Sequence, residues 1–356
     1  MVREQKMRII KSAFLATTIL SAGVTSASAE VNVMASIKPI HSLVSAVMDG
    51  AGTPSLIIEG AGSPHNYALK PSQAAALQDA DLVFWVGHDL EAFLEKAIDS
   101  VALNARSIAL SDAHGLTKIK FREGGSFDAH AHDDHDDHDD HDDHDEHDDH
   151  DDHDKHDDHD KHDDHDDHDK HDDHDKHDDH GHEGYDPHVW LDPENAKALI
   201  HEIEEALVAA DPENAATYER NAEAMMRKLD ALITEINAEL EPVKGKGYVV
   251  FHDAYQYFER RFGVSAVGSI TVSPEILPGA KRVSELQEKV KSLDATCVFS
   301  EPQFEPKLVT TITENTTART GVLDPLGASM EGGPGLYFTL IRTMAHSLKD
   351  CLLGKS

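Results

Sequence analysis

Three histidines outside the repetitive part of the chain stand in a setting that suits metal binding. His65 lies in Gly-Ser-Pro-His-Asn-Tyr, His188 lies in Asp-Pro-His-Val-Trp-Leu, and His252 follows the apolar run Tyr-Val-Val-Phe. Asp324 follows the last strand-like run of the chain, in Leu-Asp-Pro-Leu-Gly. In α/β proteins the loops after strands carry most functional groups, so these four side chains could contribute to one site.

Three imidazoles and one carboxylate oxygen would form a tetrahedral ligand set that suits Zn²⁺. Nitrogen-rich sites also accept copper, nickel and cobalt, whereas manganese and magnesium prefer more carboxylate. The chain contains neither an HExxH nor a CxxC motif. The spacing therefore leaves open whether each histidine is a ligand or a hydrogen-bonded structural residue.

A repeat of Asp-Asp-His, in places Asp-Lys-His, occupies residues 130–182 and is a second element with metal-binding chemistry. It holds 19 of the 27 histidines and a net charge of −24, out of −36 for the whole chain. Neutral imidazoles bind Zn²⁺, Cu²⁺ or Ni²⁺, and the carboxylates raise the local cation concentration. We expect these sites to be weak, because the string must be ordered each time it binds. The predicted weak ligands are His130, His132, His135, His138, His141, His144, His147, His150, His153, His156, His159, His162, His165, His168, His171, His174, His177, His180 and His182.

The loop 128–184, which contains this repeat, is expected to be disordered without ligand. It has no apolar side chain that could be buried, and its carboxylates repel one another. The alternative is a solvated tether that was lengthened by repeat slippage. The loop follows the segment 118–121 and ends just before His188, so it opens beside the predicted site. That position favours a scavenger of metal or a sensor of occupancy.

Strand-like and helix-like segments alternate on both sides of the loop, which predicts an α/β fold with mainly parallel sheets flanked by helices. The predicted strands cover 31–37, 54–58, 82–86, 106–110, 248–251, 266–270, 296–300 and 321–323. The predicted helices beside them cover 40–48, 71–79, 90–101, 254–262, 280–292, 306–317 and 335–352.

Apolar residues at steps of three and four between Tyr218 and Leu240 predict a further helix of about 28 residues. We therefore expect two lobes joined by one long rigid helix, with a ligand in the cleft between them. The expected organisation is a signal peptide at 1–29, an N-terminal lobe at 30–210, the interlobe helix at 211–243 and a C-terminal lobe at 244–356.

The N-terminus has the features of a cleaved export signal. A basic segment with Arg3 and Lys11 precedes the apolar run 12–24, and Ala-Ser-Ala at 27–29 offers a cleavage site. The run is too short to span a membrane comfortably, and no later segment has 18 uninterrupted apolar residues. We expect an exported, soluble monomer without membrane insertion, and Met7 is an alternative start of the chain.

Composition and cysteine content narrow the possibilities further. Only 32 Lys and Arg face 68 Asp and Glu, so the chain would be repelled by nucleic acid. Cys297 and Cys351 are an even pair in an exported protein, which predicts a disulfide. Two buried free thiols are the alternative.

Seven segments in a fixed order carry a family resemblance. They are GAGSPHNYALKPS (60–72), ADLVFWVG (80–87), PHVWLDP (187–193), GKGYVVFHDAY (245–255), PEILPGA (274–280), CVFSEPQF (297–304) and LDPLG (323–327). With them the chain resembles the periplasmic zinc-binding components of bacterial ABC importers, the ZnuA-type solute-binding proteins. The resemblance spans nearly the whole mature chain apart from the repeat.

The resemblance implies two lobes with metal between them, the three histidines as ligands, and a disulfide between the two cysteines. Some zinc-binding members have Glu directly before the first histidine, where this chain has Pro64. The fourth ligand therefore stays open between Asp324, which matches a ligand of several relatives, a water molecule, and Glu59. Manganese-binding relatives resemble a set of two histidines and two carboxylates, so His252 favours zinc.

The resemblance also implies capture of Zn²⁺ in the periplasm and its delivery to the membrane permease of an ABC importer with a cytoplasmic ATPase. The sequence has no nucleotide-binding loop, so other chains would supply the ATPase and the channel. Two alternatives stay open. One is an exported protein that stores or buffers zinc through the repeat, and the other is a zinc hydrolase with Asp253 and Glu301 as candidate bases.

Overall fold

The structure, a computed structural model, describes residues 31–122, 127, 184–271, 279–293 and 295–355. The predicted signal peptide at 1–29, the repeat with its nineteen histidines, and nearly all of the loop 128–184 lie outside the described residues. Within the described part, no helix combines the length and the apolar character that crossing a membrane requires.

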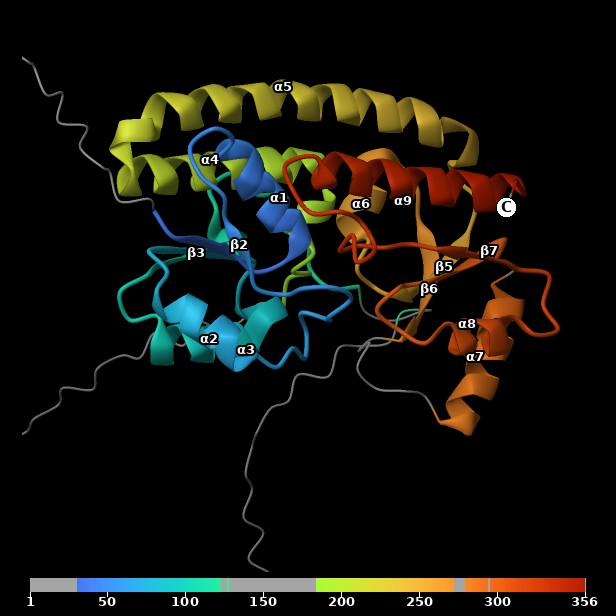
Figure 1. The fold of residues 1–356 in the computed structure, drawn as a ribbon. Helices are drawn as coiled ribbons and strands as arrows, with labels where there is room; N and C mark the ends of the chain where they lie inside the picture. The colour runs from blue at the N-terminus through green and yellow to red at the C-terminus, as the bar shows by residue number, and fades with distance from the viewer. Residues whose placement is uncertain (1–30, 123–126, 128–183, 272–278, 294, 356) are drawn as a thin grey trace, which may run out of the picture. The chain divides into compact units, whose positions relative to one another are not determined.

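The first sheet has the strand order β2-β1-β3-β4, and all neighbouring strands are parallel. Its strands are β1 (Val33–Ala35), β2 (Ser55–Leu56), β3 (Leu82–Trp85) and β4 (Arg106–Ala109). The helices around it are α1 (Lys38–Val47), α2 (Pro71–Gln78), α3 (His88–Val101) and α4 (Pro193–Ala210). α1 and α4 lie on one side of the sheet and α2 and α3 on the other (Figure 1), so β1 and β3 are buried and apolar throughout.

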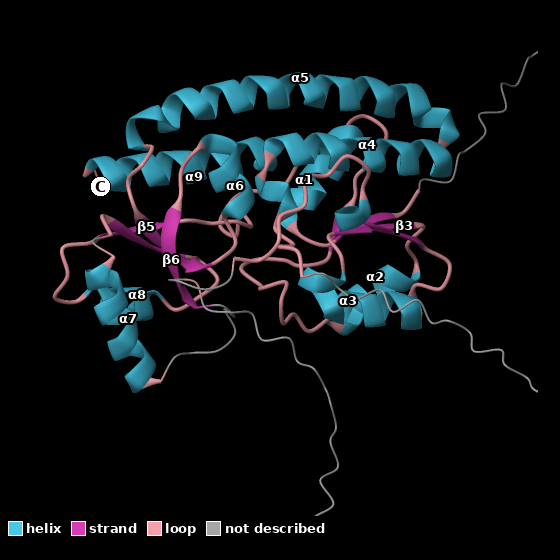
Figure 2. Cartoon of the chain, turned by 180° about the vertical axis from the view of Figure 1, so that it is seen from behind, coloured by secondary structure: helices cyan, strands magenta, loops and turns pink. Residues whose placement is uncertain are grey.

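The second sheet repeats this arrangement with the order β6-β5-β7-β8, again parallel. Its strands are β5 (Tyr248–His252), β6 (Ala266–Thr271), β7 (Cys297–Ser300) and β8 (Arg319–Val322). Its helices are α6 (Gln256–Phe262), α7 (Ala280–Ser292), α8 (Pro306–Thr313) and α9 (Leu336–Leu353). α7 and α8 cover one side, and α6 and α9 lie on the other (Figure 2). The predicted fold class is confirmed, and the predicted lobe boundaries stay predictions.

The long helix is α5 (Ala215–Leu240), which has 26 residues and follows a single turn of 3-10 helix at Pro212–Asn214. Its buried side chains recur at steps of three and four, as the sequence predicted: Tyr218, Ala222, Met225, Leu229, Leu232, Ile236 and Leu240. The first sheet and its helices form the first half of the molecule, and the second sheet and its helices form the second half. α5 packs against α1 and α4 of the first half and against α9 of the second half (Figure 1). One helix therefore supports both sheets.

Two details of the second half bear on the sequence predictions. α8 ends at Thr313 rather than at residue 317, because Glu314 has a ψ of 132°, which is outside the helical range, and Asn315 after it is left-handed with a φ of 60°. Cys297 at the start of β7 and Cys351 in α9 form a disulfide, so the sulfurs are not two free thiols. The disulfide connects the strand next to β5 with the helix that packs on α5.

Candidate metal centre

The structure brings His65, His188 and His252 together at one point. One ring nitrogen of each histidine lies within 4.8 Å of the corresponding nitrogens of the other two. The centroids of the three rings are 5.3–5.8 Å apart. Among the described residues, this is the one group of histidine, cysteine and acidic side chains that could hold a metal ion in this way.

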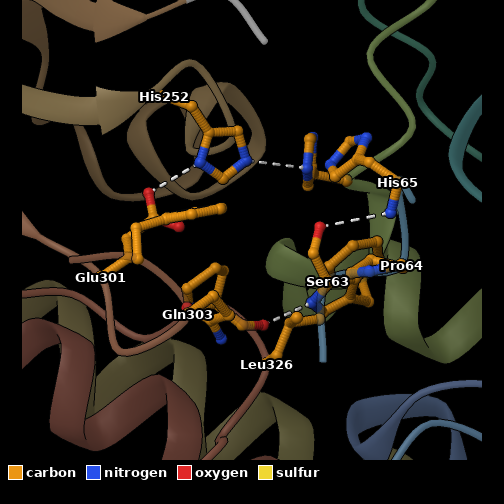
Figure 3. A pocket seen from close by; sticks show the side chains of 11 residues that line it. Ser63, Pro64, His65, His252, Glu301, Gln303 and Leu326 are labelled. Carbon is orange, nitrogen blue, oxygen red and sulfur yellow. Dashed lines mark hydrogen bonds and ion pairs between the residues drawn. The ribbon is translucent and has the colours of Figure 1, made fainter. Parts of the chain in front are cut away.

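His252 is the last residue of β5, and its ring is fixed by a carboxylate from the neighbouring strand. Its Nδ1 lies 2.7 Å from Oε1 of Glu301, which directly follows β7 (Figure 3). Because β5 and β7 are parallel neighbours, their carboxyl ends place the two side chains at one edge of the sheet. A proton on Nδ1 that is donated to the carboxylate leaves the lone pair on Nε2 for a metal. That Nε2 lies 3.4 Å from Nε2 of His188.

His188 is oriented in the same manner by a carboxylate of its own loop. Its Nδ1 lies 2.7 Å from Oδ1 of Asp186, and its backbone N–H donates to the same oxygen at 3.0 Å. The other oxygen of Asp186 accepts from Nε2 of Gln256, on α6, at 3.1 Å. His188 and His252 are 4% and 5% exposed, so both imidazoles are held inside the protein with Nε2 facing Nε2.

His65 reaches the other two from the loop between β2 and α2 and is only partly buried. Its backbone N–H donates to Oγ of Ser63 at 3.4 Å (Figure 3). The loop is closely packed at Gly62, where an added Cβ would lie 2.8 Å from the ring of Tyr67 and 3.1 Å from the side chain of Ile58. Glycine at this position therefore lets the loop pass close to its neighbours on the way to His65.

Burial and neighbouring charges shift the pKa values of the side chains in the site. Burial raises the pKa of Asp186 to about 7, although the backbone N–H of His188 and the charge of Arg122 oppose that rise. Burial is the largest single influence on the pKa of His252 and lowers it, but the carboxylates of Glu301, Asp253 and Asp186 together raise it, so the net shift is upward. Protons and cations therefore compete for the same nitrogens and oxygens.

The three imidazoles lie in a pocket whose second-half wall carries unsatisfied acceptors. On this wall, Oε2 of Glu301 and Oε1 of Gln303 are buried and have no hydrogen-bond partner among the described residues. The same is true of Oδ2 of Asp324, which does not line the pocket itself but precedes the lining residue Pro325. Buried acceptors without a partner are costly, and a cation or a water bound to a cation would satisfy them. The donor set therefore fits a divalent metal ion. The pocket is lined by Ser63, Pro64, His65, His188, Trp190, His252, Glu301, Gln303, Phe304, Pro325 and Leu326 (Figure 3).

The two acidic candidates for a fourth ligand are not part of the cluster. Oδ1 of Asp324 accepts hydrogen bonds from Nε2 of Gln303 and from the backbone N–H of Leu326, each at 3.2 Å. Glu59 is exposed and forms an ion pair with Nζ of Lys70 at 3.7 Å. Neither carboxylate belongs to the group of side chains within 4.8 Å, and the fourth ligand stays a prediction.

Two important residues were not assigned to the site from the sequence. Glu301 was considered only as a hydrolytic base, together with Asp253, whose carboxylate the structure instead pairs with Arg122. Asp186 was not singled out. A usable signal existed in both cases, since Glu301 follows a predicted strand as His252 does, and Asp186 stands two residues before His188.

Comparison with known proteins agrees with this geometry. Residues 33–351 match the family described as "Zinc-uptake complex component A periplasmic", ZnuA. The chain belongs to the ZnuA family. The high-affinity zinc uptake system protein ZnuA of Brucella abortus (strain 2308) is 57% identical over 348 residues, which are 97% of this chain and 99% of that protein. The ZnuA of Haemophilus influenzae (strain ATCC 51907 / DSM 11121 / KW20 / Rd) is 41% identical over 347 residues, with 97% and 99% covered.

The likeness extends to the fold of solved structures. The crystal structure of a ZnuA deletion mutant with zinc bound has 22% sequence identity and a TM-score of 0.65, and the match covers 91% of this chain and 98% of that one. ZnuA proteins are periplasmic components of zinc uptake systems and are solute-binding proteins rather than enzymes. The hydrolase alternative, with Asp253 and Glu301 as bases, is therefore wrong.

Proposed function

We propose that this chain captures Zn²⁺ in the periplasm and delivers it to the permease of an ABC importer. The observation that carries the proposal is the convergence of three imidazoles, two of which are held by buried carboxylates with their Nε2 atoms 3.4 Å apart. The ZnuA relatives, which are described as zinc uptake proteins, support zinc as the ion. The ligands of this site are His65, His188 and His252.

The fourth position of the zinc ion is completed by Asp324 or by a water. Asp324 is buried beside the pocket and has one unsatisfied oxygen, so a small movement of its loop would supply a ligand. A water in the same place would donate to the unpaired oxygens of Glu301 and Gln303. A high-resolution electron-density map of the zinc-loaded crystal, with the ion located by its anomalous scattering at the zinc edge, would distinguish these two arrangements.

The experiment that tests the proposal is a competition titration of the mature chain, residues 30–356, with a chromogenic zinc chelator. We expect one tight site in the wild-type chain, and its loss in the H188A variant. The H201A variant is the matched control, because His201 lies on α4 with its side chain 60% exposed and outside the cluster. A tight site that persists in H188A would refute the assignment.

The second function to test is storage, which the nineteen histidines of the repeat favour. We propose that the repeat is a low-affinity scavenger or sensor beside the tight site. Deletion of residues 130–182 should leave the tight site intact and remove most of the weak binding capacity. If the tight site disappears with the repeat, the chain is a storage protein and the three-histidine site is wrongly assigned.

A further inference from the structure

The two described ends of the His-rich loop form a short stem that is bound to the second half of the chain. The stem consists of residues 118–122 and 184–186, which pair through an antiparallel bridge between Lys120 and Tyr185. The backbone N–H of Asp186 donates to the carbonyl of Ile119 at 2.8 Å. The stem therefore leads directly into Asp186, the residue whose carboxylate orients His188.

Helix α6 holds the stem through the phenol of Tyr257. The backbone N–H of Ile119 donates to the Tyr257 oxygen at 3.1 Å, and the Tyr257 hydroxyl donates to the carbonyl of Asp186 at 2.8 Å. Gln256 on the same helix donates to the Asp186 carboxylate. These bonds connect the stem to the element that follows His252, across the metal centre.

Arg122, at the end of the stem, makes the strongest of these connections. Its Nε donates to Oδ2 of Asp253 at 3.0 Å, and its second terminal nitrogen contacts Oδ1 of the same residue. Its first terminal nitrogen donates to Oε2 of Glu259 at 2.7 Å, and its planar group lies 4.0 Å from the ring centre of Phe127. Asp253 and Glu259 are 4% and 5% exposed, so one guanidinium pairs with two buried carboxylates.

The position of these carboxylates links Arg122 to zinc binding. Asp253 is the residue directly after His252, and Glu259 lies inside α6, so Arg122 bonds both to the start of the turn that follows β5 and to the helix after it. Glu301 sets the rotation of the His252 ring, and the backbone on the C-terminal side of His252 is held by the Arg122–Asp253 pair. A buried ion pair contributes little net stability compared with apolar packing, but it defines geometry, because its donors and acceptors match only in one arrangement.

We propose that Arg122 is a positioning residue of the zinc site, which holds His252 against His188 and thereby slows release of the ion. The proposal rests on the function proposed above. Arg122 touches no ligand of the ion and acts through Asp253 and α6. Without it, two carboxylates would be left buried without a cation, and the turn that follows His252 would rearrange.

The test is the rate of zinc release from the full mature chain that has been loaded with one equivalent of Zn²⁺ and mixed with excess chromogenic chelator. We expect the R122M variant to release the ion at least about tenfold faster than the wild type, the lower end of the loss seen when outer partners of metal ligands are removed. R122K should fall between the two, because lysine keeps the charge and loses the bidentate geometry. Release by R122M at the wild-type rate would overturn the proposal.

The control is R342M, which removes a bidentate arginine–carboxylate pair far from the ligands. Arg342 of α9 donates to both oxygens of Glu235 of α5 at 2.8 Å, and both side chains are about half exposed. R342M should release zinc at the wild-type rate, within a factor of two. The d–d absorption of the Co²⁺-loaded chain gives a second reading, since R122M should change the band shape that reports coordination geometry and R342M should not.

A triple variant, R122M/D253N/E259Q, separates positioning from the cost of unpaired buried charge. It removes both carboxylates together with their cation, so it should fold even where R122M does not. Fast zinc release in the triple variant supports a positioning role, and release at the wild-type rate overturns it. Failure of the wild-type chain to retain zinc would instead refute the proposed function, and the two failures are distinguished in one experiment.

Discussion

Two parts of the metal centre are built differently. His188 and His252 are buried, and each has its Nδ1 held by a buried carboxylate, from Asp186 and Glu301 respectively. His65 comes from a glycine-containing loop and is partly exposed. The buried pair is already oriented for binding before an ion arrives, and the third imidazole meets the ion from the side that is open to solvent. The difference predicts unequal consequences when each part is changed.

The largest effect should come from removing one of the buried ligands. We expect H188A or H252A to weaken the tight zinc site more than about 100-fold, which exceeds the usual loss on removing an outer partner. H252A also leaves Glu301 buried without its partner, which should cost the metal-free protein about 1–3 kcal/mol of unfolding free energy. H65A should weaken zinc binding and leave the stability of the metal-free protein nearly unchanged. Chelator competition and chemical denaturation measure both quantities, and equal destabilisation by H65A and H252A would remove the distinction between the two parts.

Replacement of the orienting carboxylates should give the next largest effect. We expect E301Q and D186N each to weaken zinc binding about 10–100-fold, because an amide no longer fixes the tautomer and charge of the imidazole. The E223Q variant is the matched control, since Glu223 of α5 is exposed and forms an ion pair with Arg227 at 3.6 Å. Isothermal titration at pH 7.5 provides the measurement. Affinities unchanged within a factor of three would mean that the carboxylates are structural only.

Acid should release the ion, with a dependence that reflects the buried pair. A proton on His252 competes with zinc. The zinc affinity therefore has its full value at pH values above the pKa of His252 and falls as the pH decreases through that pKa. Burial lowers that pKa, but Glu301, with Asp253 and Asp186, raises it above its ordinary value, so the loss of affinity should begin above pH 6.5 and approach tenfold per pH unit for this group. In E301Q the onset should move to lower pH. An onset that is the same in both proteins would contradict the role assigned to Glu301.

The smallest effect should come from the loop that carries His65. G62A places a Cβ 2.8 Å from the Tyr67 ring, so the loop must shift, and we expect less than a tenfold loss of zinc affinity with a loss of about 1 kcal/mol in stability. G279A is the control, because a Cβ there meets no atom of the described residues within 4 Å. A loss as large as that of H188A would show that the loop is as strictly positioned as the buried pair.

Much of the fold followed from local sequence. Uninterrupted apolar runs such as 82–86 predicted buried parallel strands, and the spacing of apolar residues from Tyr218 to Leu240 predicted α5. Both patterns depend only on which faces of the strand or helix are buried against neighbouring elements. The predicted C-terminal end of α8 was wrong by four residues. The non-helical conformations of Glu314 and Asn315 that end the helix are not encoded in the spacing of apolar residues.

The site was predictable in part for a related reason. His65 and His252 were recognisable because strand ends of α/β sheets converge, and a family resemblance identified the same residues. Glu301 was assigned another role, because its contact with His252 joins residues 49 positions apart through the pairing of β5 with β7. Arg122 was overlooked, since its partners Asp253 and Glu259 lie 131 and 137 positions away. Contacts of this kind depend on tertiary structure that spacing does not specify.

Helix α5 has a mechanical consequence. It packs on α1, α4 and α9 as one uninterrupted helix of 26 residues, about 39 Å long. The helix therefore restricts rigid-body rotation of one sheet relative to the other. Loading and unloading of the ion should therefore be a matter of local loop adjustment, and the small-angle scattering curves of the metal-free and metal-loaded protein should nearly superimpose.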